Sequence, residues 1–183
     1  DVVFTTDHGE FQGDHGFLFK GPFHVDSLMR LPLVWRPAPS RAVQPSVVAD
    51  PVGLLDLAPT FCRIAGLEVP EWMDGEPLPM SPADAVSQGR QRVLTEWDSV
   101  HPAGPEVHLQ TITRDGFICT RYEPGTCHDG TEGELWDLAE DPLQFVNLWD
   151  DPARRSLRDD LVGDLVDALP ERPTTPLAIE APV

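Results

Sequence analysis

Hydrophobic positions at the start of the chain form two short runs separated by a polar loop. The first run covers residues 2–6 and is followed directly by an Asp-His-Gly triplet at residues 7–9, a pattern typical of a buried strand. The second run covers residues 31–35, and the prolines after it end the apolar pattern. We therefore predict two core strands. The polar end of the first strand lies where open α/β sheets place their binding sites.

A third apolar pattern, over residues 51–65, has the spacing of one helix face. Its members are Leu54, Leu55, Leu57, Ala58, Phe61, Ile64 and Ala65. The pattern ends at Gly66, which suits a helix C-terminal cap because glycine adopts the left-handed backbone without steric cost. We expect this helix to pack on the predicted sheet.

Residues 68–91 interrupt the regular patterns. They are rich in proline, glycine and serine, and we predict a long surface connection that separates two units. Four short strands are predicted beyond it, as in a small antiparallel sheet, over 92–97, 107–113, 116–122 and 134–138. An amphipathic helix is then predicted over 156–169, with one apolar face made of Leu157, Leu161, Leu165, Val166 and Leu169.

These patterns divide the chain into four parts. They are a core region over 1–67, the connection over 68–91, a small subdomain over 92–169 and an extended or disordered tail over 170–183. The length of 183 residues and the hydrophobic content of 40% are sufficient for a real core. We expect a soluble globular fold with no membrane span, since no stretch approaches the roughly 18 apolar residues of a membrane helix.

The first residues of the chain show no signal-peptide pattern, and the chain begins at Asp1 without a methionine. Because an apolar run starts at once, we expect the natural start, with any signal segment, to lie upstream. The cellular compartment therefore stays open, with the cytoplasm slightly favoured.

Charge and cysteine content exclude several classes of function. The chain has 31 acidic and 13 basic residues, a formal charge of -18, and no basic stripe, so we expect no nucleic-acid partner. The acidic residues are spread along the chain, which indicates a solvated surface. Three cysteines, Cys62, Cys119 and Cys127, at no metal-like spacing argue against a disulfide scaffold and a zinc site, although Cys119 and Cys127 could still pair.

The densest chemical signal is the segment TTDHGEFQGDHGFLFK at residues 5–20. Asp7 offers a hard oxygen and His8 a nitrogen, and Gly9 permits the bend that would turn both toward one divalent cation. Two ligands do not hold a catalytic metal, so further carboxylates must come from elsewhere. A simple loop turn is the alternative, and the isolated triplet favours it.

Lys20 stands at the far end of the same loop and is the only lysine of the chain. Its compact positive charge suits an anionic oxygen of a tetrahedral substrate and charge that develops there. The alternative is a surface lysine in a chain whose other basic residues are all arginine.

Together these motifs resemble the sulfatase family of the alkaline phosphatase superfamily. VVFTTDHGEFQGDHGFLFKG followed by RLPLVWRP is similar to its late signature, in which a strand ends in Asp-His or Asp-Asn, a Gly-Asp-His turn follows, and a lysine lies thirteen residues after the aspartate. Residues 54–78 resemble the family's helix and following loop, and GELWDLAEDPLQFVNLWDDP at 133–152 resembles its C-terminal subdomain motif. The resemblance covers residues 1 to about 169.

The resemblance implies a fold and a set of roles. The fold is the C-terminal part of an alkaline-phosphatase-like α/β sandwich plus a small C-terminal α+β subdomain with an antiparallel sheet. Asp7 and His8 would bind a metal, calcium first and manganese second, and Lys20 would act catalytically on the bound sulfate or phosphate group. His24 has two interpretations, a residue that reaches the substrate and a packing histidine, and we favour the packing histidine. The segment 13–15 (Gly-Asp-His) would mainly order the loop.

The family's nucleophile is absent from this sequence. It is a cysteine or serine in a C-x-P-S-R or C-x-P-x-R motif, the cysteine being oxidised to formylglycine, and PAPSR at 37–41 has proline in its place. We therefore expect a missing N-terminal half of the same fold to carry it, and the isolated chain to have little sulfatase activity. The expected substrate is a sulfate ester. Alternatives are a phosphate or phosphonate ester, or a non-catalytic anion- or protein-binding module with an exposed apolar face.

A second metal-site hypothesis involves His101, His108 and His128 with Glu96 and Asp98. These residues have no ligand spacing, and scattered polar residues are the favoured interpretation. Trp136 and Trp149 are predicted to be core and interface anchors, since a large aromatic beside turn residues usually buries area first.

Overall fold

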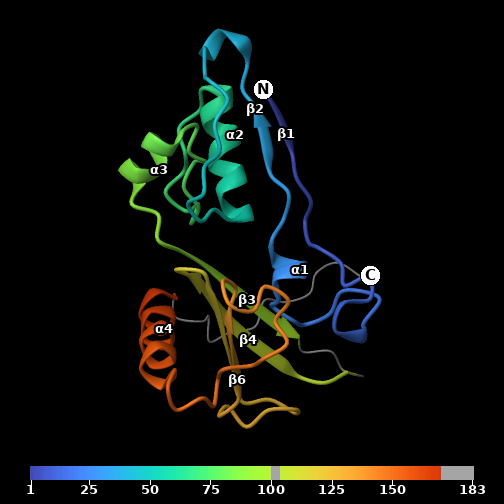
Figure 1. Cartoon of the computed structure of the whole chain (residues 1–183). Helices are drawn as coiled ribbons and strands as arrows, with labels where there is room; N and C mark the ends of the chain where they lie inside the picture. The colour runs from blue at the N-terminus through green and yellow to red at the C-terminus, as the bar shows by residue number, and fades with distance from the viewer. Residues whose placement is uncertain (100–103, 170–183) are drawn as a thin grey trace.

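The computed structural model of the chain describes residues 1–99 and 104–169, and the strands of this part form two separate antiparallel sheets. One sheet has two strands, and the other has four in the order β3-β4-β5-β6. Helices α2 and α3 lie beside the two-stranded sheet, and α4 covers one face of the four-stranded sheet (Figure 1). The predicted tail over 170–183 lies outside the described residues. None of the helices in the described part is long and apolar enough to cross a membrane.

The two predicted N-terminal strands are present but shorter than expected. Strand β1 (Val2–Phe4) pairs antiparallel with β2 (Val34–Arg36), and Val3 lies opposite Trp35. The prediction that the first strand is buried was wrong for this chain, because Val2 and Phe4 are 62% and 60% exposed. The described residues leave one face of this small sheet uncovered.

The segment between these strands holds a 3-10 turn (Asp14–Gly16) and one short α-helix, α1 (Asp26–Met29), which lies at the lower end of β2 beside the four-stranded sheet (Figure 1). Leu28 of this helix packs with Phe11 and Val25 in a small apolar cluster. The cluster supports the polar loop on one side and the helix on the other.

The predicted helix over 51–65 is a 3-10 turn (Leu54–Asp56) followed by α2 (Leu57–Ala65). Gly66 caps it with a φ of +72°, as predicted. The expected packing of its apolar face is not seen, because Leu54, Leu55 and Phe61 are exposed. The buried side chains are instead Pro59 and Thr60, and Thr60 Oγ1 accepts a hydrogen bond from Leu78 N at 2.7 Å.

The connection over 68–91 contains a helix that the hydrophobic pattern did not predict, α3 (Pro82–Gln88). Its start is marked by Ser81, whose side chain accepts a hydrogen bond from Asp84 N at 3.2 Å, and its end by Gly89 in the left-handed conformation. Capping and proline at the first turn build this helix without an apolar stripe.

A buried ion pair fastens the end of this connection to the turn before α2. Arg90 Nη1 lies 2.7 Å from Asp56 Oδ2, and both side chains are 9% exposed. Asp56 also accepts hydrogen bonds from the backbone N–H groups of Gly53 and Glu76. One carboxylate therefore joins three segments of the chain.

The second sheet confirms the predicted small antiparallel sheet. Its strands are β3 (Arg92–Ser99), β4 (Val107–Arg114), β5 (Phe117–Tyr122) and β6 (Gly133–Asp137), and helix α4 (Arg155–Ala168) packs on it. The main core combines side chains of the sheet with two of the helix, namely Ile112, Cys119, Leu135, Leu161 and Leu165. Arg114 adds ion pairs to Asp160 and Asp164 of α4.

Cysteines and tryptophans of this region have structural roles. All three cysteines are free, so the pairing of Cys119 with Cys127 that the sequence left open does not form. Cys119 lies in the core, and burial raises the pKa of its thiol to about 12. Trp136 is buried, and Trp149 packs against the core cluster with the Arg158 guanidinium 5.1 Å from its ring centre.

Candidate functional site

Asp7, His8 and Lys20, three of the residues predicted from the sequence, meet in the structure. Lys20 Nζ lies 2.7 Å from His8 Nε2, although twelve positions separate the two residues. Asp7 Oδ2 lies 3.6 Å from the same nitrogen, and its side chain is largely exposed. The loop over 9–19 thus returns Lys20 to the end of β1.

The hydrogen bonds of His8 define its tautomer. Nδ1 lies 2.6 Å from Gly9 O, and a carbonyl oxygen only accepts, so Nδ1 carries the hydrogen. Nε2 then has the lone pair and accepts from the Lys20 ammonium group. A histidine that donates one ring N–H to a backbone carbonyl and presents the other nitrogen is the usual arrangement of a metal ligand.

Asp7 and His8 together form a donor set that fits a divalent cation, with carboxylate oxygens and one imidazole nitrogen. The set is incomplete by itself. Over 1–99 and 104–169, no group of three or more His, Cys, Asp or Glu side chains is placed to hold a metal ion.

Gly9 fixes the bend of the backbone directly after Asp7 and His8. Its N–H donates to Leu28 O at 2.9 Å, and a Cβ at this position would lie 1.9 Å from Ser27 O. Only glycine allows the backbone to approach α1 this closely. The predicted role of Gly9 in the bend therefore has a direct steric basis.

The polar loop after Gly9 is ordered by aromatic packing and left-handed residues. Phe11 is buried, and its ring centre lies 5.3 Å from that of Phe17 and 5.6 Å from that of Phe23. His15 has a φ of +52°, and its ring meets the Phe11 edge at 6.0 Å. This agrees with the expectation that the Gly-Asp-His turn orders the loop.

His24 lies inside the protein, where it packs against the second sheet. Its Nδ1 is 2.7 Å from Thr111 Oγ1, which is in turn 2.8 Å from Thr120 Oγ1. Burial lowers the pKa of His24 to about 4, so the ring is neutral near pH 7. The packing interpretation that the sequence favoured fits these contacts.

A cavity of 1070 Å³ connects the predicted residues with the second sheet. Asp7, His8, Lys20 and His24 all contribute to its wall, and the segment Thr95–Trp97 of β3 forms part of another side. Sequence patterns placed β3 in a separate unit and gave no indication that it faces the loop. Sequence patterns likewise gave no indication that Thr111 contacts His24, because 87 positions separate the two residues.

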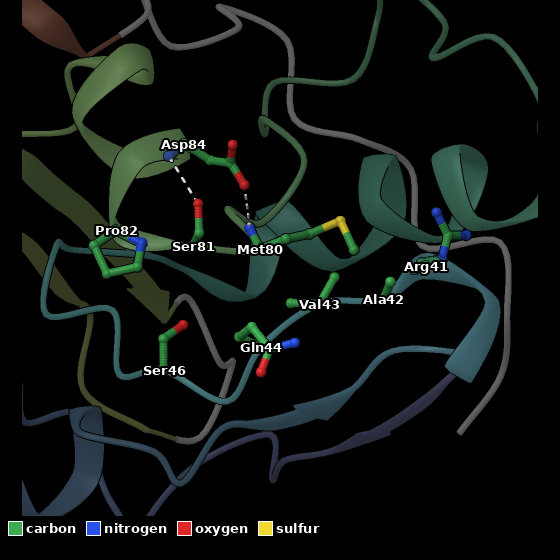
Figure 2. A pocket seen from close by; sticks show the side chains of 9 residues that line it. All are labelled: Arg41, Ala42, Val43, Gln44, Ser46, Met80, Ser81, Pro82 and Asp84. Atoms are coloured by element: carbon green, nitrogen blue, oxygen red, sulfur yellow. Dashed lines mark hydrogen bonds between the residues drawn. The ribbon is translucent and has the colours of Figure 1, made fainter.

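A second hollow of 600 Å³ lies between residues 41–46 and the start of α3 (Figure 2). Two of its polar side chains are used at the start of the helix, since Ser81 Oγ accepts from Asp84 N and Asp84 Oδ2 accepts from Met80 N. Arg41, the last residue of the PAPSR segment, lies at its edge and pairs with Asp1 at 3.3 Å. None of the predicted site residues lines it.

The second metal-site hypothesis receives no geometric support among the described residues. Both ring nitrogens of His108 contact carboxylates, Nδ1 with Asp98 at 2.6 Å and Nε2 with Glu106 at 3.1 Å. The ring of His128 stacks on Tyr122 with centres 4.1 Å apart. His101 lies outside the described residues.

Comparison with known proteins gives consistent relationships. Residues 13–170 match the family model described as N-sulphoglucosamine sulphohydrolase, C-terminal. The uncharacterized sulfatase YidJ of Escherichia coli (strain K12) is 30% identical over 169 residues, which are 91% of this chain and 31% of that protein. A choline-sulfatase of Rhizobium meliloti (strain 1021) is 29% identical over 157 residues, 82% of this chain and 27% of that protein.

A solved structure shows the same fold. The phosphonate monoester hydrolase of Agrobacterium radiobacter superposes with a TM-score of 0.73 at 26% identity, over 90% of this chain and 34% of that chain. The likeness confirms the predicted fold class. This chain spans about a third of the length of the relatives it matches.

Proposed function

The chain belongs to the family of N-sulphoglucosamine sulphohydrolase C-terminal regions, within the sulfatases of the alkaline phosphatase superfamily, and we propose that it supplies one side of a sulfuric ester hydrolase active site. The observation that carries this proposal is the meeting of Asp7, His8 and Lys20 at one cavity. The rest of the active site would come from sequence outside these 183 residues, since the relatives are about three times as long.

Asp7 and His8 are the residues that would hold a divalent cation, calcium first and manganese second. The assignment is supported by the position of Asp7 Oδ2, which lies 3.6 Å from His8 Nε2, and by the hydrogen bond from Nδ1 to Gly9 O, which leaves the lone pair on Nε2. Lys20 donates to this lone pair in the chain without a cation, so a bound cation would displace the ammonium group. A bound cation would supply Lewis-acid stabilisation of the ester's oxygens. The remaining ligands would be acidic residues outside this chain.

Lys20 would hold an anionic oxygen of the sulfate group. Its ammonium charge would stabilise the negative charge that builds on the transferred group. It is the only lysine of the chain and lies at the wall of the cavity. In the chain without a cation the ammonium group donates to His8 Nε2, and a cation bound at that nitrogen would leave the ammonium group to contact the sulfate.

His24 is a second residue that would face the ester. Its Nδ1 is occupied by the Thr111 hydroxyl, while its ring forms part of the cavity wall. When Nδ1 accepts from Thr111, Nε2 carries the hydrogen and can donate to an ester oxygen. Because the His24 ring is neutral, Lys20 would be the residue of the two that contacts the negative charge of the sulfate group.

The nucleophile would be a formylglycine on the N-terminal half of the same fold. Cys62, Cys119 and Cys127 do not stand in the required motif, and Cys119 is buried in the core. An uncovered apolar face on β1 and β2, with Val2, Phe4 and Val34 exposed, is consistent with a further half that packs there. Residues 1–183 alone would then bind ligands but not turn an ester over.

Hydrolysis of a phosphonate or phosphate ester is the second candidate. The observation that favours it is the structural likeness to a phosphonate monoester hydrolase. The Asp-His pair at residues 7 and 8 is shared by both classes of the family. The two candidates differ in the nucleophile, so the coding DNA upstream of Asp1 decides between them: a C-x-P-S-R motif favours the sulfatase, and a serine or threonine nucleophile favours the phosphoesterase.

Two measurements on purified residues 1–183 test the proposal. Manganese is expected to broaden the NMR signals of the His8 ring and the Gly9 amide, and Asp7→Ala should remove most of that broadening. Asp14→Ala is the matched control, since this exposed carboxylate lies in the same loop and should leave the effect unchanged. Equal broadening in the Asp7→Ala variant would overturn the cation site.

An aryl sulfate assay of the same protein tests the missing nucleophile. No turnover is expected. Turnover that Asp7→Ala abolishes would show that these residues hold a complete active site.

A further inference from the structure

Both parts of the proposed site are attached to one short segment, residues 24–28. On the Asp7–His8 side, Gly9 N–H donates to Leu28 O at 2.9 Å, and the Gly9 backbone lies against Ser27. Because His8 Nδ1 bonds the carbonyl of Gly9, the orientation of the His8 ring follows from the position of Gly9. A movement of residues 24–28 would therefore move the His8 ring.

The Lys20 side reaches the same segment through a tight turn. Phe23 N–H donates to Gly21 O at 2.8 Å, which closes the turn directly after Lys20. A Cβ on Gly21 would lie 2.9 Å from the Phe23 ring, so the turn has little freedom. His24 follows at once, and its position sets where the Lys20 backbone lies.

Two long-range hydrogen bonds fix the segment to the second sheet and its following connection. His24 Nδ1 lies 2.7 Å from Thr111 Oγ1 of β4, across 87 positions of sequence. Asp26 N–H donates to Gln144 Oε1 at 2.7 Å, across 118 positions. Thr111 and Gln144 are 1% and 3% exposed, so water does not compete for either contact.

Two features of Gln144 are unfavourable for the stability of the fold. Its φ is +56°, in the left-handed region that a residue with a side chain rarely adopts. Its Nε2 is buried and has no hydrogen-bond partner among the described residues. A buried donor without a partner and a strained backbone both oppose folding, so the acceptor Oε1 is the feature that this residue contributes.

Thr111 is placed between two partners in the same way. Its hydroxyl lies between His24 Nδ1 and Thr120 Oγ1, with distances of 2.7 and 2.8 Å. One hydroxyl can donate to the first and accept from the second. Valine has nearly the same shape but would break both bonds, while serine would keep them.

We propose that Thr111 and Gln144 are positioning residues, which set the geometry of His8 and Lys20 through residues 24–28 without touching the ester. The identity of the bound ester rests on the proposed function. The coupling itself is a property of this chain and can be measured without any ligand. It links a site near the N-terminus to residues more than 80 positions later in the sequence.

The test is NMR on the whole chain, free of added metal and anion. Thr111→Val should shift the signals of the Gly9 amide, the His8 ring and the Lys20 side chain, with loss of the hydrogen-bond shift at His8 Nε2. Thr111→Ser should restore native signals. Thr113→Val, on the same face of β4 but outside the contact to His24, is the matched control and should leave all three residues unchanged.

Gln144→Gly separates hydrogen bonding from strain. Glycine favours the left-handed backbone, so the variant should fold at least as readily as Thr111→Val while it lacks the acceptor for Asp26 N–H. We expect the same shifts at Gly9, His8 and Lys20. If Thr111→Val does not fold, this variant tests whether the contacts to residues 24–28 position His8 and Lys20.

The proposal is overturned if Thr111→Val and Gln144→Gly shift only the signals of His24 and Asp26. It is also overturned if Thr111→Ser shifts the site as much as valine does. A manganese titration of the same samples reports separately on the cation site, so a chain that binds no manganese but shows the shifts would retain the coupling and lose the proposed function.

Discussion

Lys20 Nζ and His8 Nε2 lie 2.7 Å apart, which joins the only lysine of the chain to the residue that follows Asp7. The ammonium group donates, and the imidazole lone pair accepts. Each group therefore restricts the other in the chain without a ligand, and a cation bound at Nε2 would release the ammonium group.

Replacing Lys20 by methionine should weaken sulfate binding about tenfold, because one charge-assisted contact of roughly 1.4 kcal/mol is lost. Lys20→Arg keeps the charge and should retain part of the affinity. The measurement is a sulfate titration followed by the His8 ring signals. Equal affinity of the methionine variant and the native chain would remove Lys20 from the anion site.

Gly9 and Gly163 should respond in opposite directions to the same substitution. Gly9→Ala places a Cβ 1.9 Å from Ser27 O, and we expect a loss of about 1–3 kcal/mol in the free energy of unfolding. Gly163 lies exposed in α4 with nothing within 4 Å of its Cβ position, so Gly163→Ala should stabilise by about 0.5–1 kcal/mol. Urea unfolding of both variants checks the pair, and a Gly9→Ala protein as stable as the native chain would contradict the close backbone approach.

The ion pair of Arg90 with Asp56 is expected to contribute strongly because both side chains are almost fully covered. Arg90→Ala leaves a buried carboxylate without its cation, and the expected loss is about 3–5 kcal/mol. Arg30→Ala serves as the control, since the side chains of its pair with Asp26 are 80% and 29% exposed and the pair should contribute at most about 1 kcal/mol. Similar losses in the two variants would show that burial does not distinguish these pairs.

Protonation of His24 should make the stability depend on pH. Its pKa in the folded chain is about 4, below the value of 6.5 for an unfolded chain. The unfolded state therefore binds more protons between these values, and stability falls as the pH drops from about 6.5 to about 4. The full effect is at most about 3 kcal/mol.

Urea unfolding of the native chain and a His24→Gln variant between pH 4 and 7 measures this contribution. The difference in unfolding free energy between the two proteins should shrink as the pH falls, because the native chain alone loses the His24 contribution. A difference that stays constant across this range would mean that His24 titrates normally.

The sequence predicted the parts of this site that depend on short-range geometry. Asp7, His8 and Lys20 lie within one loop, so their residue types and spacing contain the information that brings them together. The strands β3 to β6 and helix α4 were likewise visible, since turn residues and apolar periods mark them locally.

Other features could not be predicted because they depend on contacts across the fold. The bonds of Thr111 and Gln144 to residues 24–28 join positions that no local pattern relates. Helix α3 has capping residues but no apolar stripe, so a search for periodicity misses it. The prediction that β1 is buried was wrong because an apolar run indicates that a strand is suited to burial but does not identify the residues that would cover it.

Amine chemistry on this protein has a single side-chain target, since Lys20 is the only lysine of its 183 residues. The same amine is the one hydrogen-bonded to His8 at the wall of the cavity. The rate at which a reagent acylates one peptide therefore measures how firmly that ammonium is held. Mass spectrometry of the acylated peptide would therefore report on the environment of Lys20 without isotope labelling.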